Sequence, residues 1–328
     1  MVLKECICLL LLGTSASAEQ LSEEPFLTHI EQLTFPSMGF EKAGEAYFSP
    51  DGQTIIFQAV PFGERHYQIY CLNLTERIPY RVSTGKGACT CGYFRPDGKK
   101  IIFASSHESP EVEEEDPLEN TGKYKWDFTR YMNIYEADLD GSSLRPLTSG
   151  PAYHAECGYS PDSSLIVYAS NEDGSMNLYL IDAQGNFVTQ LTHTTHCYNG
   201  GPFISPRGDE VLFRADRETP DCLQLFVIGI DGQNERQLTA NGAVNWAPFW
   251  HPSGDVIAYT TSIHGHHAYE IYLLNIRTGI EHRLTHTPTF DGLPSFSYNG
   301  TKMVWTSKRG GGNCQIFMAD FQMPLELQ

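Results

Sequence analysis

The sequence predicts an all-β fold, a six-bladed β-propeller built of four-stranded antiparallel blades. Three observations predict it: a turn signal recurs six times, an aromatic residue follows each signal at a constant distance, and a strand near the N-terminus supplies what the last repeat lacks. Repeats of about 46 residues that each hold four short strands are typical of propeller blades.

The turn signal marks the first hairpin of each repeat. Counted from the proline position, successive signals are 46, 65, 45, 46 and 46 residues apart, so the second repeat carries an insertion. Proline pre-sets such a turn and glycine tolerates a positive φ, which predicts a tight hairpin into a buried strand. The six signals are Ser49-Pro50-Asp51-Gly52, Arg95-Pro96-Asp97-Gly98, Ser160-Pro161-Asp162-Ser163, Ser205-Pro206-Arg207-Gly208, His251-Pro252-Ser253-Gly254 and Ser297-Tyr298-Asn299-Gly300.

Each hairpin leads into an apolar strand that ends in an aromatic residue seven positions after the proline position. A second apolar strand follows, with a pattern such as Ile-Tyr or Leu-Phe, and most repeats close on a strand that ends in Leu-Thr. Four short antiparallel strands per repeat are therefore predicted. The aromatic residues are Phe57, Phe103, Tyr168, Phe213, Tyr259 and Trp305.

The last repeat ends near Phe321 without a fourth strand, and a segment with the matching pattern, Ile30–Thr34, lies near the N-terminus. We expect this strand to complete the sixth blade and close the ring, which leaves no exposed inner edge. The expected organisation is a signal peptide at 1–18, a lead-in segment at 19–28, and a single propeller at 29–328 with an insertion at about 107–130.

The charge and the N-terminus predict where the chain works. Its 40 acidic and 22 basic residues give a net charge of −18, which argues against nucleic acid or an anionic membrane surface as a partner. The apolar run Cys6–Gly13 is shorter than the roughly 20 residues that span a bilayer, and a small-residue cleavage pattern ends at Ala18. We expect a cleaved signal peptide, a periplasmic or secreted location, no transmembrane anchor, and a monomer.

Seven cysteines follow the predicted cleavage site. Seven is an odd number, so at least one thiol stays unpaired within a monomer. We expect most of them to be buried as small hydrophobic residues. They are Cys71, Cys89, Cys91, Cys157, Cys197, Cys222 and Cys314.

The Ser-Pro-Asp-Gly turns, the apolar strand with its aromatic end, the Ile-Tyr strand and the Leu-Thr ending resemble the WD40-like (PD40) repeats of the TolB propeller family. The resemblance covers about residues 29–322; it implies the fold and says little about function. TolB itself carries a separate N-terminal domain without a counterpart here, which argues against a direct role in the Tol-Pal system. Related repeats occur in the prolyl oligopeptidase group, but its Gly-x-Ser-x-Gly motif is missing, which excludes that peptidase activity.

Candidate ligand-binding residues gather where the inner strands begin, at the mouth of the central channel. Together they offer thiols, an imidazole, carboxylates and amides, which suits a polar ligand pocket or a metal site. A water-lined channel without a ligand would have the same composition. The first row, seven positions before each proline position, is Ala43, Cys89, His154, Asn199, Asn245 and Asp291. The second row, two residues later, is Glu45, Cys91, Glu156, Gly201, Ala247 and Leu293, with Trp246 beside it.

A divalent metal is a further hypothesis. The loop His264-Gly265-His266-His267 lies on the same face, and together with His154 and Glu156 it offers candidate ligands. Propeller-fold pectate-type lyases use a histidine-bound metal to acidify a sugar C–H. The alternative is an ordinary exposed loop with scattered histidines. The pair Cys89 and Cys91 could bind zinc or respond to redox conditions, although buried thiols are the simpler interpretation.

The insertion joins an acidic run, 111–116, to an aromatic segment, 124–128, and we expect a lid over the channel mouth. The favoured function is a non-enzymatic module that binds a protein, peptide or glycan in the cell envelope or outside the cell. It has no catalytic residue and needs no cofactor. The alternative is a metal-dependent carbohydrate-active enzyme, a propeller-type polysaccharide lyase with a His/Glu site at the channel mouth.

Overall fold

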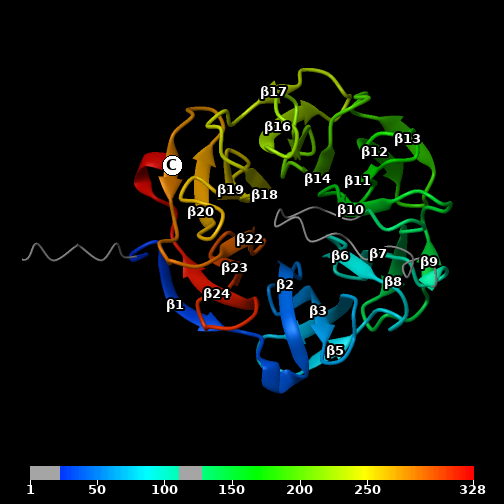
Figure 1. Ribbon diagram of the computed structural model, residues 1–328, viewed down its shortest axis with the longest axis horizontal. Helices are drawn as coiled ribbons and strands as arrows, with labels where there is room; N and C mark the ends of the chain where they lie inside the picture. Colours follow the sequence, from blue (N-terminus) through cyan, green and yellow to red (C-terminus); the bar gives the residue numbers. More distant parts are fainter. Residues whose placement is uncertain (1–22, 111–127) are drawn as a thin grey trace, which may run out of the picture.

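The computed structural model of the chain describes residues 23–110 and 128–328 (Figure 1). Within these residues, 24 strands form six four-stranded antiparallel sheets that surround a central axis. The predicted six-bladed propeller is therefore confirmed. The expected signal peptide and most of the expected lid lie outside the described residues.

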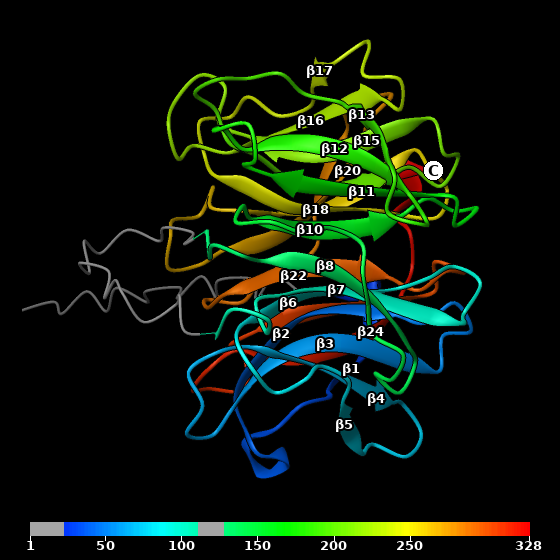
Figure 2. The same ribbon diagram turned by 90° about the vertical axis from the view of Figure 1, so that its right-hand side faces the viewer.

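Each blade runs from an innermost strand at the axis to an outermost strand at the rim (Figures 1 and 2). The innermost strands are β2 (Phe40–Phe48), β6 (Cys89–Phe94), β10 (His154–Tyr159), β14 (Asn199–Ile204), β18 (Asn245–Trp250) and β22 (Asp291–Phe296). The second strands are β3 (Thr54–Pro61), β7 (Lys100–Ser105), β11 (Leu165–Ser170), β15 (Glu210–Ala215), β19 (Val256–Thr261) and β23 (Lys302–Ser307). The third strands are β4 (Gln68–Asn73), β8 (Asn133–Asp138), β12 (Asn177–Asp182), β16 (Gln224–Gly229), β20 (Glu270–Asn275) and β24 (Gln315–Phe321). The outermost strands are β5 (Pro79–Arg81), β9 (Arg145–Pro146), β13 (Phe187–Gln190), β17 (Arg236–Gln237), β21 (Glu281–Arg283) and β1 (Leu27–Gln32).

The N-terminal strand closes the ring. β1 pairs antiparallel with β24 and so becomes the outer strand of the sixth blade, as expected. It begins three residues earlier than the predicted segment, and Thr34 lies just beyond its end. A charged contact reinforces the closure, because the Arg309 guanidinium lies 2.9 Å from both carboxylate oxygens of Glu23. Two parts of the chain that are almost 290 residues apart therefore hold each other.

The turn signal works through its serine and aspartate side chains. In the first blade the Ser49 hydroxyl donates to Asp51 at 2.6 Å and accepts the N–H of Thr54 at 3.0 Å. Gly52 has a φ of +69°, which glycine adopts without a side-chain clash. Side chain and backbone thus fix the hairpin together, which explains why this tetrapeptide recurs.

The Leu-Thr ending also has a structural role. The Thr285 hydroxyl accepts the backbone N–H of Ile271 at 2.8 Å and donates to the side chain of Glu270. A buried N–H without a partner would cost roughly 1–3 kcal/mol, so a hydroxyl at this point is favoured in every blade. The corresponding hydroxyls that accept a third-strand N–H are those of Thr34, Ser83, Thr148, Thr192 and Thr239.

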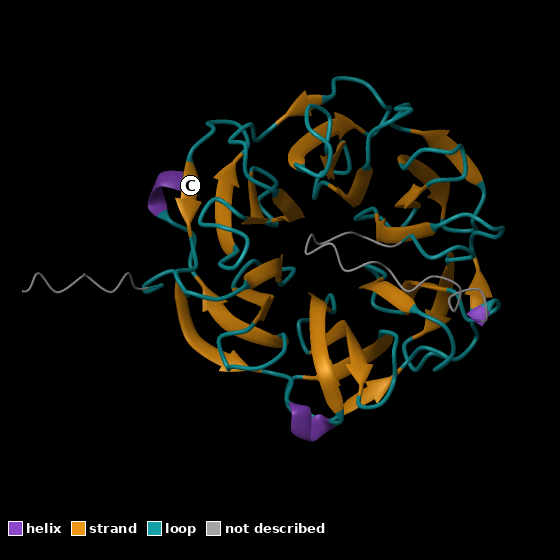
Figure 3. Ribbon diagram, in the orientation of Figure 1, coloured by secondary structure: helices purple, strands orange, loops and turns teal. Residues whose placement is uncertain are grey.

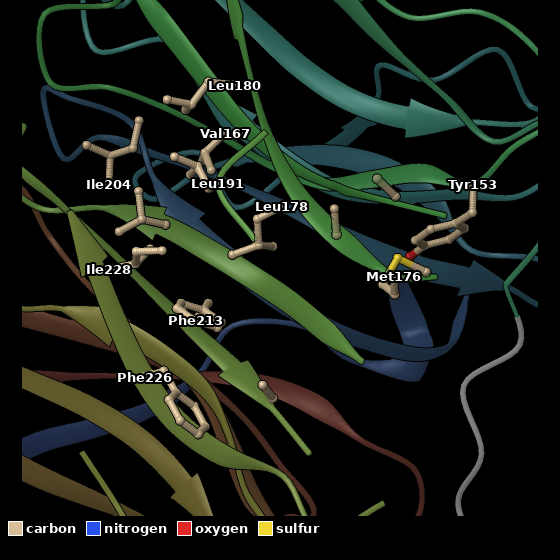
Figure 4. Packing of buried hydrophobic residues seen from close by; sticks show 14 of the residues in the cluster. Tyr153, Val167, Met176, Leu178, Leu180, Leu191, Ile204, Phe213, Phe226 and Ile228 are labelled. Atoms are coloured by element: carbon tan, nitrogen blue, oxygen red, sulfur yellow. The ribbon is translucent and has the colours of Figure 1, made fainter. Parts of the chain in front are cut away.

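The hydrophobic core lies between neighbouring blades. Figure 4 shows side chains of the third blade, such as Leu178 and Val167, facing Ile204 and Phe213 of the fourth. The aromatic residues seven positions after each turn signal are all buried, with exposed fractions of 0–4%. They fill the space between sheets, which explains their constant position in the repeat.

Helices contribute little to the fold. Two short 3₁₀ turns, η1 (Pro36–Met38) and η3 (Leu325–Leu327), lie at the rim (Figure 3). Over 23–110 and 128–328, no helix has the length and apolar character needed to cross a membrane. The same residues contain no disulfide, and Cys71, Cys89, Cys91 and Cys157 are buried.

Candidate functional site

A bulge in every inner strand decides which side chains reach the axis. In all six blades the second-row residue of the inner strand has a left-handed backbone, with φ between +48° and +57°. At this residue the register between the inner strand and its neighbour shifts, because one residue is left without a paired partner. The extra residue breaks the two-residue alternation of the strand. The residues concerned are Glu45, Cys91, Glu156, Gly201, Ala247 and Leu293.

Because of the bulge, the first row turns away from the axis. Asn245 is fully buried and donates to Gln224 of the preceding blade at 2.9 Å, and Cys89 lies 3.7 Å from Gln68 in the same way. Asp291 is fully buried and accepts from Arg309 at 2.7 Å and from Trp305 at 3.0 Å. The members of this row with polar side chains are therefore enclosed between blades: Cys89, His154, Asn199, Asn245 and Asp291.

Four aromatic rings on the inner strands meet at the axis. Tyr47 lies 5.2 Å from Tyr93, 5.7 Å from Phe203 and 5.6 Å from Phe249, measured between ring centroids. Phe203 and Phe249 pack edge to face at 4.9 Å. They come from β2, β6, β14 and β18, so the first, second, fourth and fifth blades contribute. We call these four rings the aromatic plug.

The second row and three rings of the aromatic plug, Tyr47, Phe203 and Phe249, line a pocket on the propeller axis. It encloses about 590 Å³ together with its open mouth, but the centres of water molecules fit in only about 40 Å³ of it. It is therefore narrow, with room for a few waters or one extended side chain. Its lining is Glu45, Tyr47, Cys91, Tyr153, Glu156, Cys157, Gly201, Phe203, Arg214, Trp246, Ala247, Pro248, Phe249, Leu293 and Pro294.

One part of the wall holds a buried ion pair. Glu156 and Arg214 are 7% and 5% exposed, and the guanidinium Nη2 lies 3.2 Å from the carboxylate. The Tyr198 hydroxyl lies 2.9 Å from both carboxylate oxygens of Glu156, and Arg214 donates to the same hydroxyl at 2.9 Å. The backbone N–H of Gly201 also donates to Glu156. A buried pair with this many hydrogen bonds is held in a single geometry.

Two glycines make room for this cluster. A Cβ at Gly201 would lie 2.2 Å from Arg214 Nη1, and a Cβ at Gly200 would lie 2.0 Å from the Tyr198 hydroxyl. Gly201 also has a φ of +57°. The pair Gly200-Gly201 is therefore required by the side chains that occupy the space beside it.

Glu45 lies across the pocket from this ion pair, on the first blade. It accepts from the Tyr47 hydroxyl at 3.3 Å, and its backbone N–H donates to Thr306 at 3.0 Å. Burial raises the pKa of the Glu45 carboxyl and the charge of Glu156 raises it further, whereas hydrogen bonds from Cys91 and Tyr47 and the charge of Arg214 lower it. The pocket thus has two carboxyl groups and one guanidinium, and the guanidinium is bound to Glu156.

The opposite part of the wall is apolar. The fifth and sixth blades contribute Ala247, Pro248, Leu293 and Pro294, with the ring of Trp246 at the mouth. The Leu293 N–H donates to Thr260 of the preceding blade at 3.0 Å, so the bulge needs no charged group there.

The candidate metal ligands lie in different places. His154 is buried between blades, and burial lowers its pKa to about 4. His264 and His266 bond to the hydroxyls of Tyr272 and Tyr269, at 2.7 and 2.9 Å, on an exposed loop of the fifth blade. Among residues 23–110 and 128–328, no group of three or more His, Cys, Asp or Glu side chains is arranged to hold a metal ion.

The described end of the insertion reaches the site. The Phe128 ring stacks on Tyr198 with centroids 5.8 Å apart and packs edge to face on Tyr153 at 5.3 Å. Both tyrosines bond to Glu156, so the insertion ends against the charged part of the wall. The centre of the expected lid, residues 111–127, lies outside the described residues.

Sequence reasoning did not identify Arg214, Tyr198 or the aromatic plug. Arg214 stands eight positions after its proline position, where the other blades have Gln58, Ala104, Ala169, Thr260 and Thr306. Arg214 is the one charged residue at this position of the repeat, and that difference was the sequence signal that could have identified it. All four plug rings lie three positions before the proline of their turn signal.

Comparison with known proteins agrees with this architecture. A family model described as the TolB beta propeller domain matches residues 223–324. An uncharacterized protein of Agrobacterium fabrum is 29% identical over 116 residues, which are 35% of this chain and 38% of that protein. The Tol-Pal system protein TolB of Francisella tularensis is 27% identical over 120 residues, 35% of this chain and 27% of that protein. The matched segments thus span well under half the length of these relatives.

Solved structures share the fold over most of the chain. TolB from Acinetobacter baumannii is 20% identical with a TM-score of 0.61, covering 85% of this chain and 63% of that one. An oligogalacturonate lyase in complex with manganese is 15% identical with a TM-score of 0.57, covering 91% of this chain and 94% of that one. At these identities the likeness concerns the fold alone.

Proposed function

The chain is a TolB-like six-bladed β-propeller, and on that premise we propose that it is an exported, non-enzymatic binding module. Its ligand would be a protein, a peptide or a glycan in the cell envelope or outside the cell. The ligand would dock on the face where the inner strands begin and insert one group into the axial pocket.

The observation that carries this proposal is the mixed lining of the pocket. Ligand sites are typically concave and mostly apolar, with a few fixed polar groups that set orientation. Here Glu156 is held by Arg214 and Tyr198, whereas Ala247 and Leu293 provide an apolar surface. A rigid polar group opposite an apolar wall suits recognition and requires no chemical step.

The alternative of a metal-dependent lyase has less support. A lyase of that kind needs a metal and a base near a substrate proton. The described residues hold no metal-binding group, and His154 lies between blades while His264 lies on an exposed loop. The likeness to the manganese-containing lyase extends to the fold, and we do not propose this activity.

A pair of variants tests the docking face. Ala247→Phe fills the pocket at a position where Leu293 shows that a larger side chain is compatible with the left-handed backbone. Lys99→Phe adds the same ring to an exposed turn on the opposite face. Peptides selected from a random phage-displayed library against the wild-type chain would be measured against both variants by calorimetry.

We expect Ala247→Phe to weaken the selected peptides at least about tenfold and Lys99→Phe to leave them unchanged, because a filled pocket excludes the inserted group. Equal binding to the wild type and Ala247→Phe, with both folded by circular dichroism, would refute the proposed docking face. Export is tested separately, by finding the chain outside the cytoplasm and shortened near Ala18.

A further inference from the structure

Among the described residues, the axial pocket has an aromatic floor, one apolar side and one carboxyl group, that of Glu45, without an ion-pair partner. Arg214 bonds to Glu156 and Tyr198, at 3.2 and 2.9 Å, whereas it acts on Glu45 through its charge, without a hydrogen bond. Glu45 receives the Tyr47 hydroxyl at 3.3 Å and the Cys91 thiol, both of them neutral donors. With both carboxyl groups ionised, the described lining residues carry a net charge of −1.

The aromatic residues strengthen the case for a cation. Tyr47, Phe203 and Phe249 form the floor, and Trp246 lies at the mouth. Rings around a carboxylate attract organic cations, since the face of each ring carries partial negative charge. The chain as a whole carries −18, which also draws cations toward it.

The width of the pocket restricts the shape of the ligand. Water centres fit in only about 40 Å³, which leaves no room for a sugar ring below the mouth. An alkyl chain that ends in an ammonium group is narrow enough, and its methylene groups would contact Ala247 and Leu293 on the apolar side. A metal ion would find one available carboxylate where it needs several oxygen ligands.

We propose that the pocket binds an organic ammonium ion on an alkyl stem, with its charge at Glu45 and its stem along the Ala247–Leu293 side. This inference rests on the proposed binding function and names the group that is inserted. The cation is either the lysine side chain of a protein partner or a free alkylamine, because both present the same chemistry.

The test uses the full chain and two probes of equal length, n-butylammonium and butan-1-ol. Calorimetry should show the ammonium ion binding at least about tenfold more tightly than the alcohol, as expected for a hydrogen bond to a charged group. Glu45→Gln should remove that difference and leave alcohol binding unchanged. Glu41→Gln, which alters an exposed carboxylate of the same strand β2, is the matched control and should bind as the wild type does.

A second measurement on the unaltered chain does not depend on the folding of a variant. The groups that face Glu45 are Cys91, Tyr47, Glu156 and Arg214, and together they leave its pKa above the ordinary value. A bound ammonium ion would favour the ionised carboxylate, so binding near pH 5 should release protons. The apparent binding enthalpy should then differ between buffers with different ionisation enthalpies.

Two peptides distinguish the sources of the cation. If acetyl-Gly-Lys-Gly-amide binds more tightly than butylammonium and its norleucine analogue does not bind, the natural cation is the lysine side chain of a protein partner. The reverse order identifies a free amine. Equal affinity for butylammonium and butan-1-ol, or full ammonium binding by Glu45→Gln, would overturn the inference. Library peptides that need the open pocket but contain no basic residue would also overturn it and leave the docking face intact.

Discussion

The two sides of the axial pocket use the same backbone for different purposes. On the first three blades the bulged strands carry Glu45, Cys91 and Glu156 into the pocket, and Arg214 joins them from β15 of the fourth blade. On the fifth and sixth blades the same bulge carries Ala247 and Leu293. Charged residues are present there too, but Asp291 is fully buried between blades and paired with Arg309.

The difference shows that one position of the scaffold can carry either a charged or an apolar side chain. A bulge N–H needs an acceptor, and Thr260 and Thr306 supply it for Leu293 and Glu45. Before the fourth blade the equivalent residue is Ala169, and the carboxylate of Glu156 accepts the N–H of Gly201 instead. The charge that lines the pocket is therefore also part of the backbone hydrogen bonding.

The largest expected effect is that of Gly201→Ala on the charged side. The new Cβ would lie 2.2 Å from Arg214 Nη1, so the guanidinium must move away from Glu156. Breaking a buried pair and placing a side chain at positive φ together should lower the free energy of unfolding by about 4–6 kcal/mol in urea titrations. The matched control is Gly208→Ala, with φ +78° and open space around its Cβ, which should cost only about 1–2 kcal/mol. Similar losses for both variants would contradict the steric explanation.

Arg214→Met is expected to be next in size. It leaves the Glu156 carboxylate buried without its cation, which should cost about 3–5 kcal/mol in the same titration. Thr260→Val removes only the acceptor of the Leu293 N–H on the apolar side and should cost about 1–2 kcal/mol. If both variants lower the free energy of unfolding by the same amount, the charged side of the pocket contributes no more to stability than the apolar side.

The buried carboxyl group of Glu270, on β20 of the fifth blade, predicts that the free energy of unfolding depends on pH. Burial raises the pKa of Glu270 from 4.5 to about 7, although hydrogen bonds from Thr285 and Arg283 oppose the rise. The folded state then holds a proton that the unfolded chain releases, so the contribution is fully present below about pH 4.5 and lost as the pH rises to about 7. The loss is at most about 3 kcal/mol.

Exchanging this residue with its equivalents tests that prediction. The same position holds Gln68, Gln224 and Gln315 in three other blades. Glu270→Gln should flatten the unfolding free energy between pH 5 and 7.5, and Gln224→Glu should introduce a slope of the same sign. An unchanged slope in Glu270→Gln would assign the pH dependence to other groups.

The smallest effect concerns two thiols two positions apart. Cys91 lines the pocket and is 8% exposed, whereas Cys89 lies between blades and is 1% exposed. Burial and the charge of Glu45 raise the pKa of the Cys91 thiol, so its reaction with methyl methanethiolsulfonate should be slow and should become faster in Glu45→Gln. Mass spectrometry should find Cys91 modified about tenfold faster than Cys89. Equal rates would mean that the pocket wall opens as a whole.

The fold was predictable because its causes repeat. The turn tetrapeptide, the buried aromatic residue and the Leu-Thr ending each meet one local requirement, and six copies make chance agreement improbable. The start of β1 was predicted three residues late, because pairing with Phe321 extends the strand beyond the apolar pattern.

The site was predictable only in part. Both rows were expected at the channel mouth, since residues two apart on a regular strand share a face. The bulge breaks that rule at Glu156 and its equivalents, so His154, Asn199 and Asp291 point between blades. A proline directly follows the bulge residue in the fourth, fifth and sixth blades (Pro202, Pro248 and Pro294) but not in the other three, so no residue type marks the bulge in every repeat. Arg214 reaches the pocket from a second strand.

The closure of the ring by β1 also has a consequence for how the protein is synthesised. β1 leaves the ribosome first, but its partner β24 and the Arg309 contact to Glu23 are made last. Throughout translation the strand therefore presents an unpaired edge, which other chains can join. Contacts between such distant segments also form slowly. Chaperones that shield β1 during synthesis would thus be expected to raise the yield of folded protein more than those that act on the completed chain.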